Sequence, residues 1–316
     1  IDGICSIASD LAVITVNYVA ERMGLIGNGI ENTALSTNKH NMRKAFELNG
    51  DPSPKSILVH SAEDIQEELI YPVIVKPLDR SGSRGIFKVC DKSELENAIN
   101  EAEMQGFIKN ALVEEFVEGQ EYSIECLSFQ GEHHFLAMTL KYTTGSPHFI
   151  ETGHIEPAPI GEEMLERAKN TVFHALDSLK IKYGASHSEL KIDKKGNITI
   201  IEIGARMGGD FIGSTLVQHS TGIDFVKAVI QISLGEEPDL TPTTALGTVG
   251  IHFICNDKDL RSYEKLSREH REYLIKDDIP QSLVGQVKDS STRFGYFIMK
   301  ASDFKSLDAY MPKTDP

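Results

Sequence analysis

The feature that most constrains the fold and chemistry of this chain is a pair of strand-like segments joined by a short turn. Each segment carries one glutamate. Residues 184–193 and 197–204 are rich in Ile and Thr, and the residues 194–197 between them carry a turn signal. Segments of this kind predict a β-hairpin. Glu189 lies on the first strand and Glu202 on the second.

The register of the hairpin decides whether the two glutamates meet. A two-residue turn pairs Lys194 with Asn197, and a four-residue turn pairs Asp193 with Ile198. Either turn predicts that Glu189 lies directly opposite Glu202. Opposed Cβ atoms are roughly 5 Å apart, and like charges at that distance repel each other. The pair therefore indicates either a bound divalent cation such as Mg²⁺ or a solvated acidic face on an edge hairpin.

Size and charge exclude several classes of protein. The chain has 316 residues, enough for two or three subdomains, and its formal net charge of −15 argues against a nucleic acid partner. No apolar run reaches the length of a membrane span, and no signal peptide is visible. The chain begins at Ile1 without Met, so we expect that an upstream segment is absent. Four widely spaced cysteines without a CxxC pair predict reduced thiols in a cytoplasmic protein.

Helical and strand-like patterns alternate irregularly along the chain, which favours an α+β fold. The patterns predict helices at about 10–24, 36–50, 61–70, 93–105, 162–179 and 223–234. They predict strands at 71–78, 86–90, 111–117, 121–129, 133–144, 184–193, 197–204, 247–255 and 295–300.

A lysine within an apolar strand is the second chemical signal. Lys76 interrupts residues 73–77, and a buried ammonium is costly without an anion. The loop 79–85 that follows is rich in Gly and Ser, so its backbone N–H groups could cradle phosphate oxygens. By itself this unit is equally typical of a hairpin turn with a lysine that reaches solvent. Beside an opposed glutamate pair, it indicates a nucleoside triphosphate with Mg²⁺.

Two further segments fit such a ligand. Residues 113–121 form an apolar strand that leads through an acidic bend, which could present backbone groups to adenine and a carboxylate to ribose; the simpler interpretation is a charged connector. Arg206 lies four residues after Glu202 and could lean back over the metal site, where a guanidinium would neutralise a phosphoryl group.

The order of these motifs resembles the ATP-grasp family, nearest to its carboxylate–amine ligases, which include carbamoyl-phosphate synthase and bacterial L-amino-acid ligases. The likeness covers about residues 2–235. It implies an ATP-grasp fold, in which two α+β subdomains grip ATP between them. The expected division is the tail of an N-terminal α/β domain, whose head is absent (1–36), the ATP-grasp domain (37–235) and a C-terminal α+β subdomain (236–316).

The resemblance also implies roles for individual residues. The metal, Mg²⁺ or Mn²⁺, would lie on Glu189 and Glu202, and Arg206 would stabilise the phosphoryl and tetrahedral states. Glu151 and His154 are candidates on the substrate side, although a structural role is the simpler interpretation of His154 and of His187. Contacts to ATP are implied for Lys39, Lys76, Ser81, Gly82, Ser83, Gly85, Glu114, Glu115, Phe116, Val117 and Glu121.

One departure from the family pattern bears on the metal. Many members carry Asn two positions after the second metal glutamate, where this chain has Gly204. A side-chain oxygen is therefore missing, and water or another carboxylate contact would have to replace it. In a lesser departure, Asn38 precedes Lys39 where Asp is common.

The predicted activity is the ATP-dependent joining of a carboxylate to an amine, with small molecules such as amino acids as substrates. Within enzymes, the alternatives are a carboxylase and a purine-pathway enzyme. Outside enzymes, they are an ATP-binding regulatory module without catalysis and a cation-stabilised structural protein. The resemblance leaves a homodimer open. The sequence identifies neither the carboxylate nor the amine, and it gives no residue-level function to 236–316.

Overall fold

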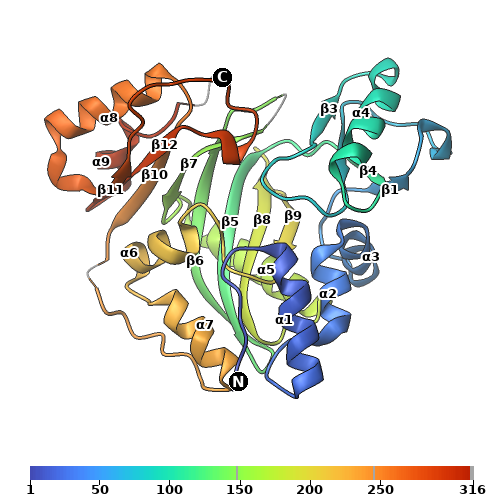
Figure 1. Cartoon of the computed structure of the whole chain (residues 1–316), viewed down its shortest axis with the longest axis horizontal. Coiled ribbons are helices and arrows are strands. Elements are labelled where there is room, and N and C mark those ends of the chain that lie inside the picture. Colours follow the sequence, from blue (N-terminus) through green and yellow to red (C-terminus); the bar gives the residue numbers. More distant parts are fainter. Residues whose placement is uncertain (147–148, 245, 314–316) are drawn as a thin grey trace.

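In the part of the chain that the structure describes, the strands form two antiparallel sheets, one of four strands and one of eight (Figure 1). The computed structural model describes residues 1–146, 149–244 and 246–313. The small sheet has the order β1 (Ser56–Val59), β4 (Ala111–Glu115), β2 (Val73–Pro77) and β3 (Phe87–Val89). A helix, α4 (Lys92–Gln105), packs Leu95, Ala98, Ile99 and Ala102 against it.

The large sheet gathers strands from two parts of the chain. Its order is β11 (Leu274–Asp278), β12 (Gly295–Ala301), β10 (Thr248–Ile254), β7 (Glu151–Glu156), β6 (Glu132–Thr143), β5 (Gln120–Phe129), β8 (Gly184–Ile192) and β9 (Ile198–Gly204). The two parts join where β10 pairs with β7, for example Val249 with Glu156. The segment after residue 236 therefore extends the same sheet that carries the glutamate hairpin.

Helices cover both faces of the large sheet. On one face, α3 (Lys39–Asn49) and α5 (Glu162–Ser178) share a hydrophobic cluster with Leu190. On the other, α7 (Phe225–Ser233) and the segment Ile212–Thr221, which ends in α6 (Val217–Thr221), share a cluster with Ala185. Alternate residues of a strand face opposite sides, which accounts for the separation of Ala185 from Leu190.

Two N-terminal helices, α1 (Asp10–Met23) and α2 (Gly29–Thr37), attach to this body through buried amides. Asn17 of α1 donates to Asn32 of α2 at 3.2 Å, and Asn32 donates to Leu179 O at 2.8 Å. The helices α8 (Asp257–Glu269) and α9 (Phe304–Asp308) pack against β10 and β12 of the large sheet. None of the helices in the described residues is long and apolar enough to span a bilayer. All four cysteines are free.

The predicted helix at 61–70 is wrong. Only a short 3₁₀ turn, Ala62–Asp64, forms there, and it has no buried residue. Ile70 is 87% exposed. Ala62, Ile65 and Leu69 pack against the cluster beside the small sheet but are only partly buried, and a short helix that buries so little apolar surface is unstable in water. Conversely, α2 was not predicted.

Candidate functional site

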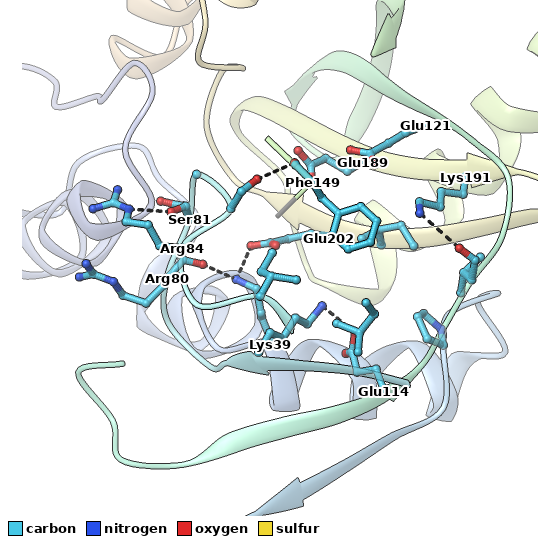
Figure 2. A pocket seen from close by; sticks show the side chains of 18 of the residues that line it. Lys39, Arg80, Ser81, Arg84, Glu114, Glu121, Phe149, Glu189, Lys191 and Glu202 are labelled. Atoms are coloured by element: carbon cyan, nitrogen blue, oxygen red, sulfur yellow. Dashed lines mark hydrogen bonds and ion pairs between the residues drawn. The ribbon is translucent and has the colours of Figure 1, made fainter. Parts of the chain in front are cut away.

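A pocket of about 160 Å³ lies between the small sheet and the glutamate end of the large sheet. It is lined by β2, the loop after β2, the segment between β4 and β5, and the hairpin of β8 and β9. Every residue predicted to take part in the site lines this pocket except Gly85 and His154. Segments more than a hundred residues apart in sequence therefore converge on one cavity (Figure 2).

Lys76 and Glu114 line the floor of the pocket beside the small sheet, and Arg43, which lies outside the lining, pairs with Glu114. Lys76 Nζ lies 2.6 Å from Glu114 Oε2, and Arg43 Nε lies 2.9 Å from Glu114 Oε1, with all three side chains buried. Burial lowers the pKa of Lys76, and the charges of Arg43 and Lys39 lower it further. The charge of Glu114 opposes this shift but does not outweigh it. Burial by itself would raise the pKa of Glu114, but Arg43 and Lys76 outweigh it and the pKa is lowered. Glu114 thus serves as the anchor of Lys76.

Lys39, the first residue of α3, bridges both halves of the pocket. Its Nζ lies 2.7 Å from Glu202 Oε1 and donates to Arg80 O at 2.8 Å (Figure 2). Asn38 places it there by capping α3, since its side chain accepts from the amide of Asn41 at 3.1 Å. Lys39 therefore ties the glutamate hairpin to the loop after β2.

The glycine-rich loop closes over the pocket toward the large sheet. Gly82 and Ser83 both have positive φ, 70° and 58°, which lets the chain turn back sharply. Ser83 Oγ donates to Phe149 O at 3.0 Å and lies 3.5 Å from Glu151 Oε2. Gly85 lies outside the pocket lining, where a Cβ would come within 2.9 Å of Gln105 on α4. A glycine at position 85 therefore allows the loop to pack closely against α4.

The segment after β4 forms the wall that was predicted to face adenine. The ring centres of Phe116 and Phe149 are 6.4 Å apart, and Lys88 Nζ lies 4.1 Å from the Phe116 ring centre. Two backbone groups are already engaged here, because Glu115 N donates to Lys55 O at 3.0 Å and Val117 O accepts from Lys191 at 3.2 Å (Figure 2). An adenine would have to use other backbone groups of residues 115–117.

The predicted opposition of Glu189 and Glu202 is confirmed, but neither predicted turn register is correct. Ile192 pairs with Ile198 at the turn, which would place Glu202 opposite Ser188. A β-bulge between Glu189 and Leu190 shifts the register by one residue and restores the pairing. Opposed residues share a face of the sheet, so the bulge puts both carboxylates on the pocket side.

Lys141 of β6 neutralises this acidic side of the pocket. It was not predicted from the sequence. Its Nζ lies 2.6 Å from Glu189 Oε1, 3.1 Å from Glu121 Oε1 and 3.7 Å from Glu151 Oε1. Burial would lower the pKa of Lys141, but these carboxylates raise it well above its usual value. Burial would likewise raise the pKa of Glu189, yet Lys141 and His187 hold it well below its usual range. A lysine within an apolar strand, the signal that identified Lys76, was also available here.

His187 also lines the pocket, next to the metal candidates. Its Nδ1 is paired with buried Glu125, and its Nε2 lies 3.4 Å from Glu189 Oε1. Burial would lower the pKa of His187, but Glu125 and Glu189 raise it to about 9. The other oxygen of Glu125 accepts from Gly208 N at 2.9 Å. Glu125 thus links β8, which carries His187 and Glu189, to the turn after Arg206.

His154 lies outside the pocket lining, buried on β7. Its Nε2 lies 3.4 Å from Asp210 Oδ2, and Arg293 holds both oxygens of Asp210 at 2.8 and 2.6 Å. Burial would raise the pKa of Asp210, but His154 and Arg293 hold it well below its usual range. His154 therefore reaches the C-terminal segment, whereas Glu151 lies in the pocket.

Arg206 lines the pocket, as predicted, and is held by Asp10 of α1. Asp10 was not identified from the sequence, because nothing in its segment suggests that it lies next to a residue 196 positions away.

The carboxylates of Glu189 and Glu202 suit a metal ion that takes its remaining ligands from water and substrate. In the described part of the chain, no group of three or more His, Cys, Asp or Glu side chains is arranged to hold a metal ion by itself. Glu189 and Glu202 provide two carboxylates on one face. Mg²⁺ commonly uses one or two carboxylates and completes its shell with water and substrate phosphates. The donor set fits that ion.

Comparison with known proteins agrees with the architecture. A family model described as an ATP-grasp domain matches residues 69–214. An L-arginine-specific L-amino acid ligase of Bacillus subtilis is 27% identical over 270 residues, which cover 81% of this chain and 63% of that protein. An alanine–anticapsin ligase of Bacillus subtilis strain 168 is 27% identical over 259 residues, which cover 73% of this chain and 54% of that protein.

The same likeness is seen in three dimensions. The crystal structure of an L-amino acid ligase from Bacillus licheniformis aligns with a TM-score of 0.82 and 26% identity, covering 98% of this chain and 77% of that one. The chain spans about half to two thirds of the length of the curated relatives. The predicted α+β fold of the ATP-grasp type is confirmed. Residues 69–214 match an ATP-grasp domain, and the whole chain is similar in structure to an L-amino acid ligase.

Proposed function

We propose that this chain carries the active site of an ATP-dependent carboxylate–amine ligase. The observation that carries the proposal is the convergence of Lys39, Lys76, Glu189, Glu202 and Arg206 on one pocket. Ligases of this kind need positioning and charge neutralisation and no protein nucleophile. Relatives named as amino acid ligases favour amino acids as the carboxylate and the amine.

ATP binds, in this proposal, with its base against the segment 115–117 and its phosphates toward the lysines. Glu121 lies at the pocket wall, where a carboxylate can accept from ribose hydroxyls. Lys76, fixed by Glu114, and Lys39 neutralise phosphate oxygens, while the loop 79–85 covers them. Lys39 would exchange its contact with Glu202 for phosphate as Glu202 takes up the metal.

Glu189 and Glu202 would hold Mg²⁺, which neutralises charge on the phosphates when bound. An oxygen of the substrate carboxylate attacks the γ-phosphorus of ATP, the bond from that phosphorus to the β–γ bridging oxygen breaks, and ADP leaves. The amine nitrogen then attacks the acyl carbon, the carbon–oxygen bond to phosphate breaks, phosphate leaves, and the amine loses a proton. Arg206 would stabilise the charge that develops in both steps.

The finer features follow from the same proposal. Residues 37–235 would act as the ATP-grasp unit, with 1–36 as the tail of an N-terminal domain and 236–316 on the substrate side. Arg293 supports that role for the C-terminal segment, because it reaches Asp210 and donates to Glu151 O at 3.2 Å. A cytoplasmic location and a homodimer stay predictions.

The test is release of ADP and phosphate by the full-length protein with Mg²⁺, screened over pairs of L-amino acids, with the amide product identified by mass spectrometry. We expect release only when both partners are present. Glu202→Gln should lower turnover at least about 100-fold with unchanged circular dichroism, whereas Glu237→Gln, an exposed glutamate elsewhere, should leave it unchanged. Full activity of the Glu202→Gln protein would refute the metal assignment.

A further inference from the structure

Arg206 is held from outside the segment that matches the family model. Its Nε donates to Asp10 Oδ1 at 2.8 Å and its Nη2 donates to Asp10 Oδ2 at 3.0 Å, while its Nη1 donates to Met207 O at 3.1 Å. The matched segment begins at residue 69, whereas Asp10 is the first residue of α1. A guanidinium has five N–H donors, so donors remain for a ligand in the pocket.

Gly204 provides the space for this contact. A Cβ at position 204 would lie 2.9 Å from Asp10 Oδ1, 3.0 Å from Arg206 Cζ and 3.1 Å from Arg206 Nε. Cβ atoms are essentially never found closer than 3.0 Å to another heavy atom. A side chain at residue 204 would therefore push the Asp10 carboxylate or the Arg206 guanidinium away from its present position, and Gly204 leaves room for their contact.

Asp10 is held on a fixed support. Ser9 caps α1, and Asn17, about two turns further along the helix, donates to Asn32 at 3.2 Å and to Thr33 at 2.9 Å. Asp10 and Arg206 are mostly buried, with side chains 21% and 13% exposed. Burial would raise the pKa of Asp10, but Arg206 outweighs it and the carboxyl stays ionised at neutral pH. The pair is thus a charged, two-point contact.

We propose that Asp10 is a positioning residue for Arg206, so that α1 completes the reactive end of the pocket. Arginine has a long side chain with several rotatable bonds, and the two-point contact restricts it to one orientation beside Glu202 and Glu189. Arg206 acts on the reacting group and Asp10 acts only through Arg206. This inference rests on the proposed ligase function for its kinetic consequence, but the contact itself can be tested without turnover.

The first experiment measures how exposed Arg206 is to phenylglyoxal, with the modified arginines identified by mass spectrometry. Asp10→Ala should raise the modification rate of Arg206 several-fold, because the guanidinium loses its partner. Arg293, which is held by Asp210, should react at its original rate and serves as the internal control. Equal rates at Arg206 with and without Asp10 would overturn the proposal, whether or not a ligase substrate has been found.

The second experiment uses kinetics. Asp10→Ala should lower kcat about 10- to 100-fold, as is typical when a supporting partner is lost, with the KM for ATP changed less than about twofold. Asp10→Asn, which keeps one acceptor oxygen, should lie between. Glu31→Ala, which removes the ion pair of α2 with Lys180, controls for looser packing of the N-terminal helices. Unchanged kcat in Asp10→Ala would contradict the positioning role.

A double-mutant comparison tests the link to Gly204. Gly204→Ala alone should lower kcat, because its Cβ displaces Asp10 and Arg206. In a protein that already carries Asp10→Ala, the added Gly204→Ala should cost less, because only its close approach to Arg206 remains, so the two effects should not fully multiply. Independent, multiplying effects would show that Gly204 does not serve the Asp10 contact. If the wild type releases no ADP with any substrate pair, the proposed function fails while the phenylglyoxal result still decides the role of Asp10.

Discussion

Lys76 and Glu114 form a buried ion pair, 2.6 Å from Nζ to Oε2, at the floor of the pocket. Arg43 takes the second oxygen of Glu114 at 2.9 Å. One carboxylate therefore compensates two buried cations, and it also fixes the lysine that we propose for phosphate binding. In that proposal, stability and nucleotide binding would depend on the same residue.

Glu114→Gln should lower the free energy of unfolding by about 3–5 kcal/mol, because it leaves Lys76 and Arg43 buried without a counter-charge. Urea unfolding at pH 7.5 measures the effect. Glu31→Gln, which removes an exposed ion pair with Lys180, should leave the unfolding midpoint almost unchanged. A similar small effect for Glu114→Gln would mean that solvent reaches this pair.

Lys141→Met should destabilise the protein by about 3–5 kcal/mol, since Glu121, Glu151 and Glu189 would then face each other without their shared cation. Mg²⁺ should restore part of the loss and raise the melting temperature of the variant more than that of the wild type. Thermal unfolding with and without Mg²⁺ measures both. Lys169→Met, which removes an exposed pair with Glu166, is the control and should show neither effect.

The pocket shows what the sequence could and could not predict. Motifs contiguous in sequence, such as the lysine strand with its glycine loop and the two glutamate strands, could be recognised because each carries its own pattern. The pairing of Glu189 with Glu202 was predicted correctly from an incorrect turn, since a β-bulge compensates for the register error. Bulges leave little signal in a single sequence.

Contacts between distant segments were beyond the sequence. Lys141 gathers carboxylates from three other strands, and Asp10 meets Arg206 across 196 positions. Only the tertiary fold brings such residues together. The expected helix at 61–70 failed for a related reason, because helical propensity with only partial burial of Ala62, Ile65 and Leu69 against the small sheet does not stabilise a helix.

The adjacent glycines Gly208 and Gly209 should respond differently to substitution. A Cβ at Gly208 would lie 2.8 Å from Glu125 Oε1 and 2.9 Å from His187 Nδ1, whereas a Cβ at Gly209 would meet no atom within 4 Å. Gly208→Ala should cost about 1–3 kcal/mol of unfolding free energy through crowding of that pair. Gly209→Ala should be neutral or slightly stabilising. Chemical unfolding of both variants checks the difference, and equal effects would argue against the close approach at Gly208.

Glu156 gives a prediction for the dependence of stability on pH. Burial raises the pKa of Glu156 to about 7, and the charge of Glu125 contributes to the increase. Hydrogen bonds from Ser220 and Thr139 lower the pKa but do not outweigh burial. The carboxyl of an unfolded chain has a pKa near 4.3. Between these values the unfolded state releases a proton that the folded state keeps, so Glu156 destabilises the fold progressively as the pH rises from about 4.3 to 7, and by a constant amount above.

Glu156→Gln removes the ionisable group while keeping a side chain of the same size for Ser220 and Thr139. The variant should gain up to about 3 kcal/mol of unfolding free energy at pH 8, and less than about 1 kcal/mol at pH 4.5. Urea unfolding at both values tests this, with Glu236→Gln, an exposed glutamate, as the control. A gain that does not change with pH would mean that the pKa of Glu156 is the same in the folded and the unfolded chain. The stabilisation by glutamine would then come from packing.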